Sequence, residues 1–500
     1  MKKNYKLLLL SPKQKHINYQ AHSELAKIFG KKRLMIPLAL PTIASLTPDN
    51  YKIKIIDEEI ESIPKYYKPD IVGITTLSAT SRRAFELGNI FRSQGIAVVL
   101  GGPYISYNVE EGLKHADSIV IGEAENSWEN CLQDFENGQI KQTYISETKC
   151  EFKIQKSPRW DLVPTNKIFQ CAVQATRGCP FNCDFCLVSE MFGRKMRFRD
   201  IDNVIEEVKA LPLKWVFFID DNFTINKEYA HKLMKRLKPL GISWACQASI
   251  DVANDEELLK EMADAGCFNI LIGFESLNPN SLSEMHKTHN KKAKIYKEAI
   301  KKIHKYGIQI NASFIVGFDN DTLFEFDNIF NFTLETGMAY VNLHTLSAVY
   351  GTQLHSKLKK ENRLTDLSPE LGVGFLPNME YVNFSRLEIF DKYMETLIRL
   401  FSWDTLNKKA TIYFNGGNFT KPGADINFLL KFKLSMIIFF EFIISKDKSK
   451  RRIFHNILSM IKQNKIAIDK GFAFLIYMLG INRHIKKHLL KIDEYRELIK

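Results

Sequence analysis

The chain has 500 residues, of which 45% are apolar and 25% are charged, so its composition is that of a folded protein and excludes a chain that is disordered throughout. Its length predicts about three domains, and its eight unevenly spaced cysteines exclude a disulfide scaffold and favour a reducing cytoplasm. The net charge of +13 is concentrated in residues 446–500, which hold fourteen Lys/Arg against five Asp/Glu, so nucleic-acid binding is not expected from the total alone.

Residues 1–145 alternate apolar runs with helical patterns, which is typical of a doubly wound, Rossmann-like parallel sheet. The predicted strands are Tyr5–Leu10, Tyr51–Ile56, Ile71–Thr75, Ala97–Leu100 and Ser118–Ile121. Small and turn-forming residues occur at the ends of the last three strands, where such sheets bind ligands; they include Thr75, Leu77, Ser78, Gly101, Gly102, Gly122 and Glu123. One such loop only closes a turn, whereas three together favour a ligand. A dinucleotide is not the first choice, because no G-x-G-x-x-G pattern is present.

Residues 146–168 show no clear period and are predicted to form a linker held by Trp160. Strand and helix patterns resume over residues 169–365. The predicted strands are Phe169–Thr176, Lys214–Asp220, Ser243–Ser249, Asn269–Glu275, Gln309–Phe318 and Tyr340–Ala348, and the clearest helices are Asp200–Leu211, Asn226–Leu237 and Lys291–Tyr306. Six consecutive βα units predict a partial (β/α)6 barrel, in which chemistry takes place at the carboxyl ends of the strands.

Three thiols follow the first barrel strand at the spacing C-x-x-x-C-x-x-C: Cys179, Cys183 and Cys186. This spacing indicates a metal or cluster site, and three ligands on a four-iron cluster leave one iron open to a substrate. A closed zinc site needs four ligands. The remaining cysteines lie singly: Cys131, Cys150, Cys171, Cys246 and Cys267. Of these, Cys131, Cys150 and Cys171 are interpreted as core or surface residues. A three-ligand catalytic zinc and inert thiols stay open as alternatives.

Polar residues also end the later barrel strands. They are Asp220-Asp221-Asn222, Gln247-Ala248-Ser249, Gly273-Phe274-Glu275-Ser276 and Gly317-Phe318-Asp319. We expect all of them at the same face as the thiols, because the carboxyl ends of parallel strands meet there. Strand-to-helix loops favour Asp and Asn as helix caps, which explains any one of these groups equally well.

Residues 366–500 lose the alternation and are predicted to be a basic helical domain. The expected helices are Pro369–Leu371, Phe384–Phe401, Phe428–Ile444, Arg452–Ile461 and Phe472–Leu479. The basic amphipathic end either contacts anionic lipid or is a solvated face. No apolar run approaches the roughly 18 residues of a membrane-spanning helix, so none is predicted.

The thiol motif on the first strand of a βα barrel resembles that of the radical S-adenosylmethionine (SAM) superfamily. The segment Gly273–Ser276 is similar to its SAM-binding turn, and residues 1–145 resemble the cobalamin-binding domain of one large class. The segments most similar to the branch that contains hopanoid C-2 methylase are Phe217–Phe223, Phe314–Asp319, Gly351–Leu354 and Glu361–Leu364. Two features depart from the pattern. Tyr350 replaces the proline of a Pro-Gly-Thr turn, and His115 lacks the glycine of the Asp-x-His-x-x-Gly motif.

The resemblance implies a radical SAM enzyme with a 4Fe-4S cluster, SAM and cobalamin. Cys179, Cys183 and Cys186 would ligate three irons, and cleaved SAM would give a radical that removes hydrogen from an unactivated carbon, to which cobalamin delivers a methyl group. The residues expected to contact SAM are Asp221, Gln247, Gly273, Glu275 and Ser276. Those expected to line cobalamin are Thr75, Leu77, Ser78, Gly101, Gly102, Gly122 and Glu123.

Three other functions compete with this interpretation. A cobalamin-dependent oxidative cyclase or rearrangement enzyme would use the same cofactors without methyl transfer. A methylthiotransferase would carry further cysteines in its N-terminal domain, but none precedes Cys131. A redox-sensing cluster protein would bind nucleic acid through its basic tail. The expected partners are a small-molecule or lipid substrate and an electron donor such as flavodoxin or ferredoxin. The expected location is the cytoplasm, with peripheral contact at the inner face of the membrane through the C-terminal helices.

Overall fold

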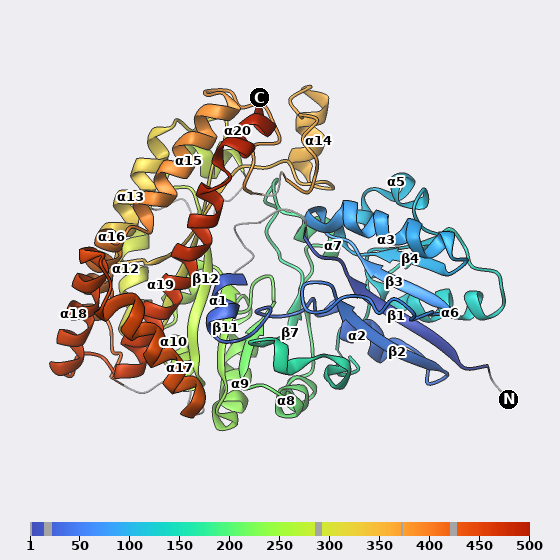
Figure 1. The fold of residues 1–500 in the computed structure, drawn as a ribbon, viewed down its shortest axis with the longest axis horizontal. Helices are drawn as coiled ribbons and strands as arrows, with labels where there is room; N and C mark the ends of the chain where they lie inside the picture. The colour runs from blue at the N-terminus through green and yellow to red at the C-terminus, as the bar shows by residue number, and fades with distance from the viewer. Residues whose placement is uncertain (1–2, 15–22, 154, 286–292, 372–373, 421–427) are drawn as a thin grey trace. The chain divides into compact units, whose positions relative to one another are not determined.

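The computed structural model describes residues 3–14, 23–153, 155–285, 293–371, 374–420 and 428–500 (Figure 1). The chain forms two compact units. The first comprises Met1–Asn18, Met35–Leu213 and Ala348–Val373, and the second Tyr19–Leu34, Lys214–Ser347 and Gly374–Lys500. Each unit therefore combines segments that are far apart in sequence, and the four-part division 1–145, 146–168, 169–365 and 366–500 stays a prediction.

The first unit is built on a six-stranded parallel sheet with the order β2-β1-β3-β4-β5-β6. Figure 1 labels its strands β1 to β4. The strands are β1 (Tyr5–Ser11), β2 (Tyr51–Asp57), β3 (Ile71–Thr75), β4 (Ala97–Gly101), β5 (Ser118–Ile121) and β6 (Thr143–Ile145). The five predicted strands are confirmed, since each agrees with the structure to one residue at either end. The edge strand β6 is additional, because three residues with only Tyr144 buried are too short to show a period.

Helices cover both faces of this sheet, which explains why its strands are continuous apolar runs. On one face, Leu8 and Leu10 pack with α3 (Ser81–Ser93). On the other, Leu9 and Trp128 both approach the Cα of Gly73, where an added Cβ would lie 3.0 and 3.5 Å from them. The remaining helices of this unit are α2 (Ala39–Leu46), α4 (Pro103–Ser106), α5 (Val109–Leu113), α6 (Trp128–Glu136), α7 (Val188–Phe192), α8 (Ile201–Ala210) and α14 (Gln353–Lys360). The predicted doubly wound domain is confirmed.

The second sheet has the order β14-β13-β12-β11-β10-β7. Its strands are β7 (Cys171–Val173), β10 (Trp215–Phe218), β11 (Ser243–Ala248), β12 (Cys267–Glu275), β13 (Gln309–Val316) and β14 (Tyr340–Thr345), and β10 to β14 pair in parallel. The helices that follow them are α9 (Lys227–Leu237), α10 (Glu256–Asp264), α11 (Pro279–Glu284), α12 (Ala293–Lys305) and α13 (Phe324–Glu335). The predicted series of barrel units is confirmed, except that the first predicted strand, Phe169–Thr176, is too long: β7 ends at Val173, and Thr176 belongs to a separate two-stranded sheet. Residues 291 and 292 of the helix predicted at Lys291–Tyr306 lie outside the described residues.

Helix caps fix the start of α8 and α9, at the residues where these two helices were predicted to begin. The Asp200 side chain accepts a hydrogen bond from the N–H of Asp202 at the start of α8, and the Asn226 side chain accepts one from Tyr229 at the start of α9. Each cap satisfies a backbone donor that has no partner within the helix. The loops that lead from strand to helix are thereby held at defined positions.

The C-terminal part is helical, with one correction to the prediction. Its helices are α15 (Arg386–Leu400), α16 (Trp403–Asn415), α17 (Phe428–Ile438), α18 (Lys448–Lys462), α19 (Ile468–Leu489) and α20 (Ile492–Ile499), with a π-helical turn at Phe439–Ile443. The predicted helix Pro369–Leu371 is wrong: these residues form a turn, and three residues do not complete one turn of α-helix. Helix α16 was missed because Lys409 interrupts its apolar face.

An N-terminal helix packs against the C-terminal part of the second unit. Leu25 of α1 (Ser23–Ile28) contacts the α19 backbone so closely that a Cβ on Gly480 would lie 3.0 Å from the Leu25 Cβ. Glu24 forms an ion pair with Lys487 of α19. None of the described helices combines the length and the apolar content needed to cross a membrane.

Candidate functional site

The three motif cysteines lie on one loop of the first unit, between β8 (Thr176–Arg177) and α7. Cys179, Cys183 and Cys186 are all partly exposed. The N–H of Cys186 donates to the carbonyl of Cys183 over 3.0 Å, which closes a tight turn between the last two thiols. The loop therefore presents three cysteines within reach of solvent and of an incoming cluster.

Backbone geometry fixes the start of this loop. Strand β8 pairs antiparallel with β9 (Arg197–Phe198). Gly178 has a φ of +94°, and a Cβ at this position would lie 3.0 Å from the carbonyl oxygen of Lys195. Any other residue would be both strained and crowded there, so the glycine before Cys179 is a steric requirement of the loop.

The other five cysteines are buried: Cys131, Cys150, Cys171, Cys246 and Cys267. Burial raises the pKa of Cys131, Cys150 and Cys171 to about 12. These three groups are neutral thiols near pH 7, whereas metals and clusters bind the thiolate. The donor chemistry of the described residues thus favours the three loop cysteines.

A cluster of buried charges forms around Arg177, which directly precedes the cysteine loop. The Arg177 guanidinium donates to carboxylate oxygens of Glu123 and Glu125, each over 2.7 Å. Arg197 donates to the second oxygen of Glu123 over 2.9 Å. The side chains of Arg177 and Glu123 are 9% and 3% exposed. Burial opposes ionisation of Glu123, but hydrogen bonds from Arg197 and Arg177 outweigh it and hold the pKa of this carboxyl below its usual value. We call Glu123, Glu125, Cys150, Arg177 and Arg197 the arginine lock.

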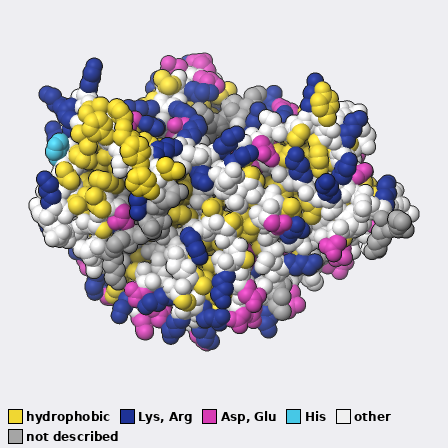
Figure 2. Space-filling model, turned by 60° about the horizontal axis from the view of Figure 1, so that its bottom comes forward, with side chains coloured by type: hydrophobic (Ala, Val, Ile, Leu, Met, Phe, Trp, Pro, Cys, Tyr) yellow, Lys and Arg dark blue, Asp and Glu magenta, His cyan; other side chains and the backbone are white. Residues whose placement is uncertain are grey.

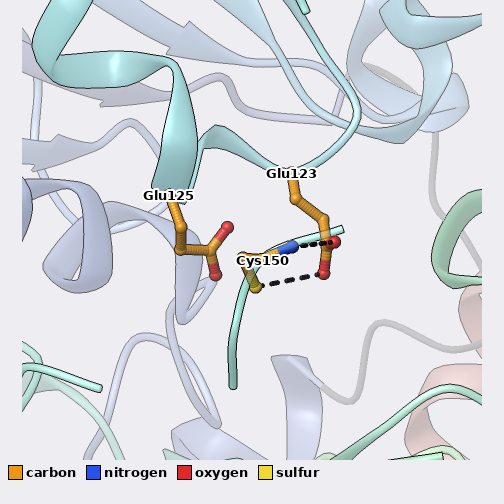
Figure 3. A group of neighbouring side chains, drawn as sticks. All are labelled: Glu123, Glu125 and Cys150. Atoms are coloured by element: carbon orange, nitrogen blue, oxygen red, sulfur yellow. Dashed lines mark hydrogen bonds between the residues drawn. The ribbon is translucent and has the colours of Figure 1, made fainter. Parts of the chain in front are cut away.

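Part of the arginine lock has the donor atoms of a metal site. Ligand atoms of Glu123, Glu125 and Cys150 lie within 4.8 Å of one another, and the Cys150 backbone N–H and thiol both donate to Glu123 (Figure 3). Two guanidinium groups already neutralise the carboxylates, however, and the Cys150 thiol has a pKa of about 12. We therefore assign these residues to an ion-pair cluster and not to a cation site.

The arginine lock connects two parts of the first unit that the sequence analysis treated separately. Arg177 stands two residues before Cys179, and Glu123 follows the loop after β5, where a cobalamin contact was predicted. Because the Glu123 carboxylate is satisfied by two arginines, its predicted contact with cobalamin stays a prediction. Sequence reasoning missed Arg177 and Arg197, although the position of Arg177 beside the motif was a signal.

A second connection holds the far side of the cysteine loop. The Gln353 side-chain amide donates to Asn182 over 3.1 Å and to Glu190 over 2.8 Å. The N–H of Leu354 donates to the carbonyl of Asp184 over 2.9 Å. The segment that resembles a Pro-Gly-Thr turn, with Tyr350 in the proline position, thus fastens the loop that carries the cysteines.

Three loops meet at the carboxyl edge of the first sheet, as predicted. The N–H of Thr76 donates to Gly101 O over 2.7 Å, and Gly122 N–H donates to Ser106 Oγ over 3.0 Å. Gly102 has a φ of +107°, and a Cβ there would lie 2.9 Å from the Thr76 backbone. The predicted cobalamin residues at this edge are Thr75, Leu77, Ser78, Gly101, Gly102 and Gly122, of which Leu77 is exposed.

His115 lies away from this edge, in the helical layer. Its ring stacks on Phe85 with centroids 4.4 Å apart. Its nitrogens lie 3.1 Å from the Asn89 side-chain oxygen and 3.4 Å from Glu111. This placement agrees with the incomplete Asp-x-His-x-x-Gly motif, because the imidazole is engaged by side chains of neighbouring helices.

In the second unit, the loops after β10 and β11 are tied together by Asn222. Its amide donates to Ser249 Oγ over 2.9 Å and accepts from the Ser249 N–H over 3.3 Å. The N–H of Phe223 donates to the Gln247 carbonyl over 2.9 Å. Two residues predicted to contact SAM, Asp221 and Gln247, are thereby held at adjoining strand ends.

The end of β12 is irregular at the residues predicted to form the SAM-binding turn. The register against β13 shifts between Gly273 and Glu275, and Glu275 has a φ of +64°. Non-glycine residues with positive φ are uncommon and concentrate at functional sites. Ser276 is buried, and its hydroxyl accepts from the N–H of Asn278 over 3.0 Å. The turn is therefore built around an unusual backbone at Glu275.

His344 of β14 is a neighbour of Glu275 that the sequence analysis did not single out. Burial lowers the pKa of His344, and this effect exceeds the opposing contributions of the Gly374 carbonyl and the Glu275 charge. Its Nδ1 donates to the Gly374 carbonyl over 3.3 Å. At neutral pH the ring is thus an uncharged imidazole, and nothing in its spacing within the sequence marked it.

The sequence of this chain matches proteins of known activity. The Radical SAM superfamily profile matches residues 173–333. The chain is 31% identical over 357 residues to bacteriochlorophyllide d C-8(2)-methyltransferase of Chlorobaculum tepidum, which covers 67% of this chain and 79% of that protein. It is 26% identical over 359 residues to hopanoid C-2 methylase of Rhodopseudomonas palustris, which covers 68% of each chain.

Two solved structures share the fold. The cobalamin-dependent SAM radical enzyme OxsB, with aqua-cobalamin bound, superposes with a TM-score of 0.63 at 13% identity, over 99% of this chain and 82% of that one. The radical SAM methyltransferase TsrM from Kitasatospora setae, with cobalamin and a 4Fe-4S cluster bound, superposes with a TM-score of 0.56 at 14% identity, over 72% and 78%.

Parallel βα units together with a three-cysteine loop define a radical SAM enzyme. More particularly, the chain belongs to the radical SAM methyltransferase family that includes this bacteriochlorophyllide d methyltransferase. A radical SAM enzyme uses a 4Fe-4S cluster and SAM, and the three partly exposed thiols on one glycine-started loop fit that cluster. The family decides against the zinc, inert-thiol and redox-sensor alternatives.

Proposed function

We propose that this enzyme methylates an unactivated carbon of a polycyclic small molecule or lipid, of the tetrapyrrole or hopanoid kind. The observation that supports it is the arginine lock, which joins the cysteine loop to the loop after β5 within one compact unit. Methyl transfer needs the cluster and cobalamin at fixed positions relative to each other. Buried ion pairs between the two loops would restrict movement of one loop against the other. The named activities of the two relatives, on a bacteriochlorophyllide and a hopanoid, support the acceptor class.

In this proposal, Cys179, Cys183 and Cys186 hold the cluster and leave one iron for SAM. The residues that bind and orient SAM are Asp221, Gln247, Gly273, Glu275 and Ser276. The residues that line cobalamin are Thr75, Leu77, Ser78, Gly101, Gly102, Gly122 and Glu123. The cofactors supply the radical and the methyl group, while these side chains orient them and exclude water. An oxidative cyclase or rearrangement enzyme is less supported, because the relative that is 31% identical to this chain is a methyltransferase.

The proposal includes a reductant and a location. An electron donor such as flavodoxin or ferredoxin would reduce the cluster, since cleavage of SAM consumes one electron. Net charge near the C-terminus supports peripheral contact with the inner face of the membrane from the cytoplasm, because fourteen of the last 55 residues, 446–500, are Lys/Arg.

Anaerobic reconstitution with iron, sulfide and SAM tests the enzyme. We expect the reduced wild type to release 5′-deoxyadenosine and Cys183→Ala to release none, whereas Cys131→Ala, which alters a buried thiol, keeps the activity. Incubation with methyl-labelled SAM and a cell extract should label a polycyclic or lipid product that has one carbon and two hydrogens more than its substrate. A protein that holds a cluster but cleaves no SAM contradicts the proposal. A product of unchanged carbon number would favour the cyclase alternative.

A further inference from the structure

Helix α17 and the π-helical turn after it expose a large apolar surface (Figure 2). Phe428 is 78% exposed, Leu429 77%, Phe432 60% and Phe440 57%. The exposed apolar residues that make up this surface, here called the α17 patch, are Phe428, Leu429, Phe432, Met436, Phe439, Phe440, Ile443 and Ile444. Folded proteins seldom leave so many large apolar side chains together in water unless the surface meets something.

The sequence of α17 is apolar on all sides instead of on one. Its eleven residues contain eight apolar side chains, and Ile438 is the buried residue of the helix. The following turn anchors the element, because Phe442 is fully buried and packs edge-on against Trp403 with ring centroids 5.2 Å apart. A helix that packs only on protein shows one apolar face, so the outer faces of α17 are matched to a second apolar environment.

Positive charge surrounds the α17 patch. Lys431 and Lys433 lie on the helix, and Lys446 and Lys448 follow the turn, all four exposed. The acidic residue within the patch, Glu441, is neutralised by Lys450 and Arg483, each over 2.5 Å. Hydrogen bonds from these two cations overcome the effect of burial and hold the pKa of Glu441 below its usual value.

A hollow of about 410 Å³ opens within the patch. Phe432, Met436 and Phe440 form its apolar wall, and the charged residues Lys433, Glu441 and Arg483 also line it. The apolar wall suits an acyl chain, and the Lys433 ammonium suits a phosphate group, whereas Arg483 is paired with Glu441. The hollow therefore combines the two chemistries of a phospholipid.

We propose that α17 and its π-helical turn insert into the interfacial layer of an anionic lipid bilayer. The helix is about 16 Å long, which is too short to cross a hydrocarbon core of about 30 Å but is suited to lie in its surface. A second copy of the chain is a poorer occupant, since a symmetric dimer would bring equal patches and their lysines together. The inference extends the membrane part of the proposed function and does not depend on the methyl acceptor.

Vesicle co-sedimentation of the full-length protein tests the proposal. We expect binding to vesicles of equal parts phosphatidylcholine and phosphatidylglycerol, and much weaker binding to phosphatidylcholine alone. Phe432→Asp should reduce the partition coefficient by roughly tenfold or more. The matched control is Phe324→Asp, because Phe324 is 64% exposed but lies outside the patch, and it should bind as the wild type does. Lys446→Glu combined with Lys448→Glu should weaken binding to the anionic vesicles, as should added salt.

Two results would overturn the proposal. One is equal vesicle binding by the wild type and Phe432→Asp. The other is a wild type that ignores vesicles but dimerises with concentration, with Phe432→Asp monomeric, which would make the patch an interface between copies. Cleavage of SAM by the same preparations separates this proposal from the enzymatic one. Phe432→Asp should cleave SAM in solution as the wild type does, and a protein that cleaves no SAM can still bind vesicles through the patch.

Discussion

Two regions of the protein break the usual rule of burial in opposite senses. The arginine lock buries charges, with Arg177 9% and Glu123 3% exposed. The α17 patch exposes apolar groups, with Phe428 78% and Phe432 60% exposed. In the lock, hydrogen bonds between opposite charges compensate for lost water, whereas in the patch a fully buried anchor, Phe442, holds apolar side chains out into solvent.

This difference indicates separate roles for the arginine lock and the α17 patch. Burying ions costs free energy that close pairing only partly returns, so a buried ion pair is better explained by the geometry it holds than by stability. Exposed aromatic groups do not position any other part of the protein. They contribute favourable free energy only when another surface covers them. The lock thus positions the cysteine loop, and the patch makes an external contact. The following variants test whether the two regions differ in this way.

Arg177→Met should have the largest effect. It leaves Glu123 and Glu125 with one guanidinium fewer in a buried site, which should cost about 3 to 5 kcal/mol in free energy of unfolding. We also expect the reconstituted variant to hold less iron per chain than the wild type. Denaturant titration and iron analysis measure these effects. Arg159→Met is the control, because its pair with Asp161 is exposed and should be worth less than about 1 kcal/mol.

The comparison fails if Arg177→Met lowers the free energy of unfolding and the iron content no more than Arg159→Met does. The buried pairing would then neither stabilise the fold nor position the cysteine loop. A loss of iron without a loss of stability would sharpen the comparison. That result would show that the ion pairs position the cysteine loop but do not stabilise the fold.

Phe442→Ala and Phe432→Ala compare two aromatic residues within one segment. Truncation of the fully buried Phe442 should cost about 3 to 5 kcal/mol, since it leaves a cavity beside Trp403. Truncation of Phe432 should change the free energy of unfolding by less than about 0.5 kcal/mol. Thermal unfolding in the absence of lipid measures both. A large cost at Phe432 would mean that the patch packs against protein.

Lys409→Met should stabilise the protein. Lys409 is fully buried in α16, its ammonium nitrogen has no hydrogen-bond partner among the described residues, and burial lowers its pKa to about 7. Because the folded pKa lies below the unfolded value of 10.5, the wild type gains stability as pH rises from about 7 to about 10. The advantage of the variant should therefore be on the order of 3 kcal/mol at pH 7 and shrink toward pH 10.

Denaturant titrations at both pH values measure this advantage. Lys408→Met, at the exposed neighbouring position, should show no such trend. An advantage that is independent of pH would mean that the Lys409 amine is paired, like the charges of the arginine lock.

Gln353→Ala should have the smallest effect. It removes hydrogen bonds to Asn182 and Glu190 at an exposed position, which should cost about 1 kcal/mol or less. We expect chelators to remove iron from this variant a few times faster than from the wild type. The exposed Gln463→Ala is the control. An unchanged rate of iron loss would mean that the arginine lock alone positions the cysteine loop.

Features that depend on a few neighbouring residues, such as strand bounds and helix starts, were predicted well from the sequence. Strands β3 and β5 agree with the prediction at both ends, and the helices predicted to begin at Asp200 and Asn226 do start at these residues, which cap them. Burial on both sheet faces, and hydrogen bonds between residues two or three positions apart, leave their pattern within a few residues. The prediction failed where that pattern was too short or interrupted, as in β6, at Pro369–Leu371 and at Lys409 in α16.

By itself, the sequence determined the cysteine spacing, the sequence of strands and helices and, through its resemblance, the radical SAM family. Only the tertiary structure decided which distant groups meet: Arg177 with Glu123 across 54 positions, Gln353 with Asn182 across 171, and Leu25 with Gly480. It also decided that an apolar stretch predicted simply as a helix leaves its side chains in solvent. The reason is physical: periodicity records that a side chain will be buried, but the packing of whole elements determines what covers it.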